Sequence, residues 1–220
     1  MTIVKKDIHR NTHVGLFMLA TDSFVLVPDQ LEEDEVEEIA GVLRVDPVPS
    51  RVAGTSLIGV FAAGNSSGVV VPYIVREEEV NGLKEHGIEV LVVKDVPTAM
   101  GNLVAANDRG VVVSRSIRKE NASRIAEFLG AEEWEWTNVA GTELAGASIV
   151  ATNRGFLVHP NATEEEISAL KRVFGVDGIA TTVNYGDPFV RTAVVANSNG
   201  VIVGDDTSPV ELMRIEDVLG

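Results

Sequence analysis

The sequence predicts an α/β fold: a five-fold pseudo-symmetric propeller of ββαβ repeats, with strands inside and helices outside. Three observations support this prediction. One pattern of an Asn, a turn, a Gly and an apolar strand recurs through the chain, with a weaker copy near the start. The copies begin 44, 42, 46 and 44 residues apart, so five units fill the 220 residues. We also find none of the atypical polar end repeats that an open solenoid needs, which favours a closed ring.

The hairpin turns define the repeats. The clear copies are N-S-S-G-V-V-V-P, N-D-R-G-V-V-V-S, N-R-G-F-L-V-H-P and N-S-N-G-V-I-V-G. Their Asn and Gly positions are Asn65 and Gly68, Asn107 and Gly110, Asn153 and Gly155, and Asn197 and Gly200; the weaker copy starts at Thr21. An Asn in such a turn bonds the turn backbone, so we interpret these residues as structural. A ring of polar contacts to a partner is the alternative.

The second repeat shows the expected order of elements. We predict a strand at Leu57–Ala62, a turn at Asn65–Gly68, a strand at Val69–Val71, a helix at Glu77–His86 and a third strand at Glu89–Val93. The third strand is continuous in Val and Leu, so we expect it to be buried. One such repeat is too small to bury its own apolar face, so residues 1–220 are expected to form a single domain.

In the other repeats, residues typical of helix starts and ends predict the helices. Thr163–Glu166 is a capping-box pattern, and Gly175 ends the helix that follows. The same capping-box pattern occurs at Ser208-Pro209-Val210-Glu211, with Pro at the first helical position. Acid-rich or mixed segments at Glu32–Val42 and Lys119–Leu129 supply the helices of repeats one and three.

The two faces of such a ring consist of different loops. One face carries the hairpin turns. The opposite face carries the links between blades, which we expect at Pro47–Gly54, Pro97–Asn102, Val139–Gly146 and Asn184–Arg191. The N-terminal segment near Ile3–Ile8 is expected to complete the last blade and close the ring.

Composition excludes several classes of function. The formal charge is −15, with 33 Asp and Glu against 18 Lys and Arg. Such a chain is repelled by nucleic-acid phosphates and suits a basic protein partner; adaptation to high internal salt is a compatible explanation. There is no Cys, which excludes disulfides, thiolate metal sites and thiol nucleophiles. We find neither a signal peptide nor an apolar run long enough for a membrane, so we expect a cytoplasmic protein.

Candidate catalytic and metal sites are weak. Gly64–Gly68 matches the G-x-S-x-G pattern of serine hydrolases, but a strand rather than the required helix follows it. His9 and His13 have helical spacing without a helical pattern or a third ligand. His159 is more consistent with a packed or capping role, and the acid pair Asp205-Asp206 with a helix N-terminus. We therefore expect no catalytic residue, no metal and no cofactor.

The links between blades are the better candidate for a binding surface, because interface cores favour Met and aromatic residues beside Arg. The alternative is that these apolar side chains plug the mouth of the ring. The candidates are Arg51, Met100, Asn102, Leu144, Asn184, Tyr185, Phe189 and Arg191, with Pro188 beside them.

The ordered set of motifs resembles the translation initiation factor 6 family, in particular its archaeal branch. The resemblance extends over all five repeats, and the chain ends just after its fifth predicted helix, as in archaeal members. The matching stretches are Ala53–Gly59, Gly64–Asn65 with Gly68–Pro72, Ala99–Asn102, Asn153–Gly155 with Leu157–Pro160, Thr182–Asn184, and Gly204–Thr207 with Glu211–Leu212.

The resemblance implies a function. Members bind the large ribosomal subunit on the face that meets the small subunit, chiefly through an L14-type ribosomal protein near the sarcin–ricin loop, and so keep the subunits apart. It implies a non-enzymatic, pentein-like monomer without a small-molecule substrate. The alternative is a catalytically inactive binding scaffold of the same fold. Guanidine-modifying enzymes with this fold use a Cys nucleophile, which this chain lacks.

Overall fold

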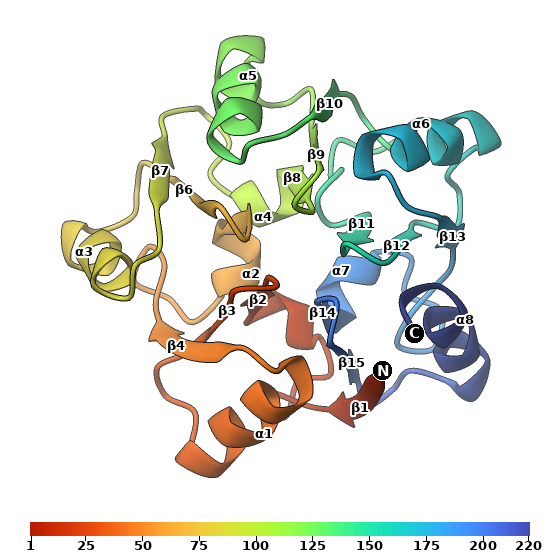
Figure 1. Ribbon diagram of the computed structural model, residues 1–220, viewed down its shortest axis with the longest axis horizontal. Helices are drawn as coiled ribbons and strands as arrows, with labels where there is room; N and C mark the ends of the chain where they lie inside the picture. The colour runs from red at the N-terminus through yellow and green to blue at the C-terminus, as the bar shows by residue number, and fades with distance from the viewer.

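Five small sheets surround a central axis in the computed structural model, which describes residues 1–220, and the chain visits them in order around the ring (Figure 1). We call each sheet a blade. Blade one contains β2 (Leu19–Ala20), β3 (Phe24–Pro28) and β4 (Asp46–Ser50); blade two β5 (Ala63–Asn65), β6 (Gly68–Pro72) and β7 (Val90–Val93); blade three β8 (Val104–Ala106), β9 (Gly110–Val113) and β10 (Glu133–Trp136); blade four β11 (Ile149–Ala151), β12 (Phe156–Val158) and β13 (Gly178–Ala180); blade five β14 (Val194–Ala196), β15 (Gly200–Gly204) and β1 (Thr2–Lys6).

Every blade has the same strand pairing. In blade two, β5 runs antiparallel to β6, with Ala63 opposite Val70, and β6 runs parallel to β7, with Val69 opposite Val90. A parallel neighbour requires a crossover, and the helix between β6 and β7 supplies it. The blades are therefore ββαβ units, and the predicted five-fold α/β fold is confirmed.

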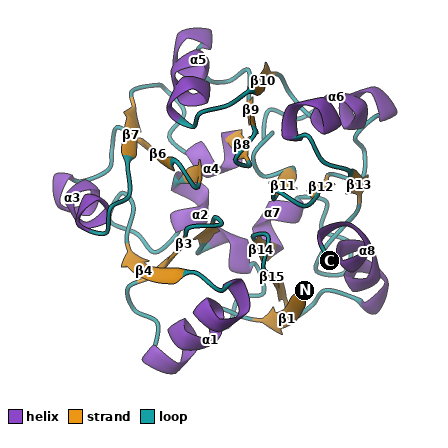
Figure 2. Cartoon of the chain, in the orientation of Figure 1, coloured by secondary structure: helices purple, strands orange, loops and turns teal.

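Five long helices form the outer layer of the ring (Figure 2). The predicted capping boxes are present at Thr163 and Ser208, whose hydroxyls accept hydrogen bonds from the backbone N–H of Glu166 and Glu211. Gly175 ends its helix in the left-handed conformation, at φ 66°. The helices are α1 (Glu33–Leu43), α3 (Glu77–Glu85), α5 (Lys119–Phe128), α6 (Glu164–Phe174) and α8 (Pro209–Leu219).

The N-terminal strand closes the ring. β1 pairs parallel with β15, from Thr2 opposite Gly200 to Lys6 opposite Gly204, and takes the place that the outer strand holds in the other blades. The N-terminus consequently lies in blade five, and the C-terminus follows α8, which packs against β12 and β13 (Figure 1). The predicted closure of the last blade by the N-terminal segment is confirmed.

Short helical turns near the axis were not predicted. The strand expected at Leu57–Ala62 is wrong: residues Ile58–Phe61 form helix α2, and the first strand of the blade begins only at Ala63. Equivalent turns are η1 (Val14–Leu16), α4 (Met100–Leu103) and α7 (Val190–Ala193). They pack backbone to backbone, since a Cβ placed on Gly59 would lie 1.9 Å from the carbonyl oxygen of Gly15.

Two further expectations need correction. The third strand of repeat two, β7, is not buried: Val92 is 40% exposed, because β7 is the outer strand of its sheet. The segment expected to be a link at Pro47–Gly54 is partly strand, since β4 continues to Ser50.

The core consists of five apolar clusters, each shared by adjacent blades. Val69 and Val71 of β6 belong to the cluster shared with blade one, whereas Val70 belongs to the cluster shared with blade three. Successive side chains of a strand point to opposite faces, so a strand packed on both faces needs a continuous apolar run. This is why the middle strands are uninterrupted apolar runs, rich in Val. No helix of the molecule is both long and apolar enough to span a membrane.

Candidate functional site

The parallel outer strands give the ring two distinct faces. The hairpin between the first two strands lies at one end of each blade, and we call this side the hairpin face. The outer strand runs parallel to the middle strand, so it ends at the opposite side, where the chain crosses to the next blade. We call that side the linker face; its loops comprise residues 7–13, 51–57, 94–99, 137–146 and 181–189.

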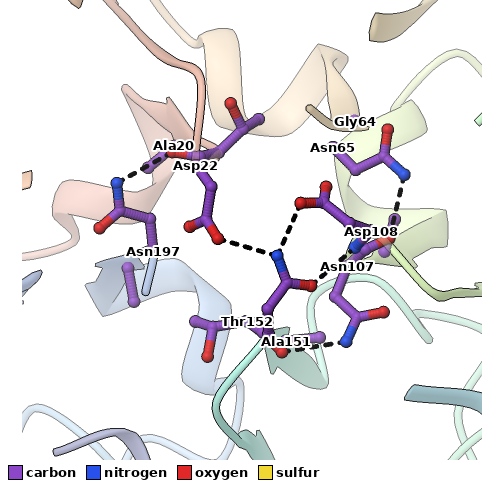
Figure 3. Close-up of a pocket in the computed structure, with 13 residues that line it drawn as sticks. Ala20, Asp22, Gly64, Asn65, Asn107, Asp108, Ala151, Thr152 and Asn197 are labelled. Atoms are coloured by element: carbon purple, nitrogen blue, oxygen red, sulfur yellow. Dashed lines mark hydrogen bonds between the residues drawn. The ribbon is translucent and has the colours of Figure 1, made fainter. Parts of the chain in front are cut away.

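The turn Asn residues join neighbouring blades on the hairpin face (Figure 3). The Asn107 Oδ1 accepts from the backbone N–H of Arg109 and Gly110. Its Nδ2 donates to the carbonyl oxygens of Thr152 and Phe174 in the next blade, at 3.0 and 2.9 Å. Asn65 and Asn197 make the same pair of donations to the blade that follows each of them. These contacts support the structural interpretation of the turn Asn residues.

The fourth repeat is aligned one residue differently from the sequence prediction. Thr152, rather than Asn153, occupies the first turn position, and its hydroxyl accepts from the backbone N–H of Arg154 and Gly155. Thr21 holds the same position in blade one. Asn153 instead donates through Nδ2 to Asp22 and Asp108, at 2.8 and 2.6 Å, and so links blades one, three and four.

The pocket on the axis of this face is too small for a substrate. It has a volume of about 20 Å³, whereas small-molecule sites usually span hundreds. The Ser66 hydroxyl of the hydrolase-like pattern donates to Asp108 at 2.9 Å, and the strand β6 follows it. Small residues from every blade line the pocket beneath the turns: Ala20, Gly64, Ala106, Ala151 and Ala196.

The histidines do not assemble a catalytic or metal site. No group of three or more His, Asp or Glu side chains lies close enough together to hold a metal ion. His13 Nε2 lies 3.1 Å from Asp187, while His9 stacks edge-on against Phe17. His159 is buried, and its Nδ1 accepts from the backbone N–H of Asn161, so the packed role is confirmed. Burial lowers the pKa of His159, although nearby carboxylates partly oppose the shift.

The loops of the linker face contain tight left-handed turns. Ala53 and Ala140 have φ values of 55° and 54°, and Asn184 and Tyr185 have 44° and 62°. Non-glycine residues adopt this conformation only when their surroundings hold them in it. A short antiparallel bridge closes each turn, for example between Val52 and Thr55.

A glutamate from the nearest outer helix fixes three of these turns. The Glu79 carboxylate accepts from the backbone N–H of Ala53 and Gly54, at 2.9 and 2.7 Å. Glu166 accepts from Ala140. Glu211 accepts from the N–H groups of Tyr185 and Gly186, from its own helix cap at Ser208 and from the Thr182 hydroxyl.

The hydrogen bonds keep Glu211 ionised. Its burial alone would raise the pKa of the carboxyl, but the donated hydrogen bonds of Thr182, Ser208 and Gly186 together outweigh burial and lower the pKa. Asp95 behaves in the same way: burial raises its pKa, and hydrogen bonds from Asn121, Arg118 and Val96 more than compensate.

Six of the eight candidate interface residues have accessible surface on the linker face. Tyr185 is 85% exposed and Leu144 is 38% exposed. The other four are half-buried: Arg51, which pairs with Asp29; Asn102; Asn184, which donates to the Thr12 carbonyl; and Phe189, whose ring stacks against His159.

The two other candidates point away from this surface. Met100 has no exposed surface, so the prediction that it contributes to a surface is wrong; it packs in the core between blades two and three. The Arg191 side chain turns inward and donates to the carbonyl oxygen of Ala62 at 3.2 Å. For Met100 the alternative, that these apolar side chains plug the mouth of the ring, fits better than a surface role. Loop assignment alone does not give the direction of a side chain.

Sequence reasoning missed one part of this face. Val96, in the loop after β7, is 91% exposed, and Tyr73 is half exposed beside it. With Lys94, Asp95 and Arg118 they line an open cavity of about 430 Å³. The signal available was an apolar residue within the charged segment Lys94-Asp95-Val96-Pro97.

Comparison with known proteins decides the family. The model of the eIF-6 family matches residues 3–218, which is almost the whole chain and all five blades. The chain belongs to the eIF-6 family.

Curated relatives carry the name translation initiation factor 6. The protein of Pyrococcus furiosus is 40% identical over 138 residues, which is 60% of this chain and 61% of the relative. That of Aeropyrum pernix is 41% identical, over 64% of this chain and 61% of the relative, and that of Thermococcus kodakarensis is 38% identical, over 67% of each. The matches thus span about three fifths to two thirds of the relatives' length.

One solved structure is also similar at a low level. DDAH from Pseudomonas aeruginosa, a cysteine-to-serine mutant complexed with citrulline, is 12% identical and has a TM-score of 0.48 over 77% of this chain and 69% of that one. At this level the likeness says nothing about function. The eIF-6 family relatives are named as translation factors rather than enzymes.

Proposed function

We propose that this eIF-6 family chain binds the large ribosomal subunit and sterically prevents it from joining the small subunit. The observation that carries the proposal is the family match over residues 3–218, together with relatives that are named translation initiation factor 6.

The linker face is the proposed contact surface. It presents an exposed aromatic residue, Tyr185, and an exposed Leu144 among half-buried polar groups such as Asn102. Aromatic side chains in a polar setting commonly anchor protein interfaces. The glutamate contacts hold these loops in fixed conformations, so little conformational entropy would be lost on binding.

Charge favours a basic ribosomal protein as the direct partner. A molecule with a formal charge of −15 is attracted to a basic surface, which accelerates encounter, and is repelled by RNA phosphates. An L14-type protein near the sarcin–ricin loop, as the family resemblance implies, meets this requirement. We propose that the factor acts as a monomer in the cytoplasm, where the subunits meet.

The steric mechanism requires a rigid body. Each blade shares an apolar cluster with its neighbours, and β1 closes the ring by pairing with β15. A ring whose core lies between blades cannot flatten without exposing that core. It would therefore hold the two subunits apart until it dissociates as a unit.

Co-sedimentation with purified ribosomal subunits tests the proposal. We expect the protein to migrate with the large subunit and not with the small one. Tyr185→Ala and Leu144→Ala should each weaken this binding by about tenfold, because an anchor truncation commonly costs more than 1 kcal/mol. Met213→Ala is the matched control, since it removes an exposed apolar side chain from the outer helix α8.

The outcomes separate the site from the function. Unchanged binding by both linker-face variants, with circular dichroism intact, would remove this face as the contact surface. No migration of the wild-type protein with the large subunit would refute the function itself.

A further inference from the structure

One position in the ring of short axial turns differs from its four equivalents. Gly15, Gly59, Gly101 and Gly146 occupy this position in blades one to four, and a Cβ on any of them would lie within 2.4 Å of a neighbouring backbone oxygen. Blade five carries Arg191 instead, second in α7 as Gly59 is in α2. A glycine allows the closest backbone packing, so replacing it by the longest cation has to be accommodated elsewhere.

The Arg191 side chain is accommodated in the middle of the ring. It lines an axial cavity of about 30 Å³ together with small and apolar residues of all five blades; these include Met18, Gly64, Ala106, Val150 and Val195. The residue as a whole is half-buried, and its Nε is fully buried without a hydrogen-bond partner. One bond, to the carbonyl oxygen of Ala62, is the contact that the chain itself provides.

The chain supplies no counter-charge to this group. None of its six close ion pairs includes Arg191. Burial lowers the pKa of Arg191 to about 10, which leaves it protonated at neutral pH. Buried charges in proteins are normally paired, and a guanidinium has five N–H donors to satisfy.

We propose that the axial cavity binds one small monovalent anion, a halide such as chloride, against the guanidinium of Arg191. A halide supplies both the missing hydrogen-bond acceptor at Nε and the missing negative charge, whereas water supplies only the acceptor. The cavity volume exceeds the roughly 10–15 Å³ that one water-sized occupant needs. It is too small for an organic carboxylate or a nucleotide. The apolar lining favours a weakly hydrated ion over a strongly hydrated one.

Bromide diffraction tests the site directly in the wild-type protein. Crystals soaked in sodium bromide and measured at the bromine absorption edge should show an anomalous peak beside Arg191 Nε. A cavity that holds density without anomalous signal contains water and overturns the proposal.

Halide-dependent stability provides the second test. The ionic strength is held constant by replacing gluconate with chloride. At chloride concentrations well above the dissociation constant, each tenfold increase in chloride should raise the folded-to-unfolded ratio about tenfold. Arg191→Gly, which restores the residue of the other four blades, and Arg191→Met should lose this dependence; Arg115→Met, at an exposed arginine, should keep it. Equal chloride dependence in wild type and both Arg191 variants would contradict the proposal. The bromide experiment remains decisive if neither Arg191 variant folds.

Discussion

Three glutamates, Glu79, Glu166 and Glu211, each connect an outer helix to a loop of the linker face. All three lie at the third position of their helix and accept from the backbone N–H of its cap residue. The sequence predicts this capping box for Glu166 and Glu211, but not the second set of donors in the preceding loop. One carboxylate thus stabilises both the start of a helix and a left-handed turn, and this holds exposed Tyr185 in place.

Glu211→Gln should reveal this double role through its pH dependence. At about pH 7 the variant should lose about 2–3 kcal/mol in the free energy of unfolding, because an amide cannot accept all of these bonds. The folded-state pKa of Glu211 is lowered, so its contribution exists above the ordinary Glu value and disappears as pH falls through the lowered pKa.

The measurement is urea unfolding of both proteins from about pH 7 to about pH 3. The difference between wild type and Glu211→Gln should shrink toward acid, where the wild-type carboxyl is itself neutral. A difference that stays constant over this range would show that the charge of Glu211 contributes nothing.

His159 adds a separate decline in wild-type stability: its pKa is lowered, so protonation of the unfolded chain below about pH 6.5 opposes folding.

Among the elements, the short axial turns determine how closely the blades approach. The Cβ that Gly101 lacks would lie 1.9 Å from the carbonyl oxygen of Gly59, just as that of Gly59 would meet Gly15. Each turn therefore packs on the preceding one through bare backbone, and the chain repeats this contact around the axis. These turns could not be predicted from the sequence. Ile58-Gly59-Val60-Phe61 is a short apolar run, and a buried strand has the same pattern.

Gly59→Ala should destabilise the fold, while Gly82→Ala should not. The first adds a methyl group against fixed backbone, for which we expect a loss of more than about 3 kcal/mol. Gly82 lies in α3 with no atom within 4 Å of its potential Cβ, and Ala is a better helix former there by about 0.5–1 kcal/mol. Thermal unfolding of the two variants compares them directly. An equal or higher melting temperature for Gly59→Ala would contradict the close-packed axis.

At the scale of the whole molecule, closure of the ring stabilises the fold, whereas the net charge destabilises it. β1 removes the exposed edge that β15 would otherwise present, and every outer helix packs against a strand. The surface nevertheless carries a formal charge of −15, whose self-repulsion favours expansion. Salt screens such repulsion, so this molecule should be more stable in concentrated salt.

The melting temperature should therefore rise from low to molar KCl. Most of this rise should persist in potassium gluconate, since screening depends on ionic strength rather than on anion identity. A melting temperature that does not change from low to molar KCl would contradict the interpretation that the acidic surface is an adaptation to high internal salt. The additional, chloride-specific part belongs to Arg191 and should be absent in Arg191→Gly.

The sequence determines the repeating parts of this fold well and its particular side-chain directions poorly. Helix ends were predictable because Thr163, Ser208 and Gly175 act locally. The turn at Thr152 was misaligned with Asn153 because Asn is the commoner turn residue and only the three-dimensional hydrogen bonds distinguish them. Met100 and Arg191 were placed on the surface because their segments lie between blades, whereas the inward direction of their side chains depends on axial packing that no local pattern encodes.

The most direct test of the central claim is a subunit-joining assay. Purified large subunits are incubated with the protein, small subunits are added, and formation of joined ribosomes is followed by light scattering and gradient sedimentation. We predict that joining falls as the protein saturates the large subunit, and that preincubation with the small subunit alone has no effect. Unchanged joining at concentrations that saturate the large subunit would contradict the proposed anti-association function.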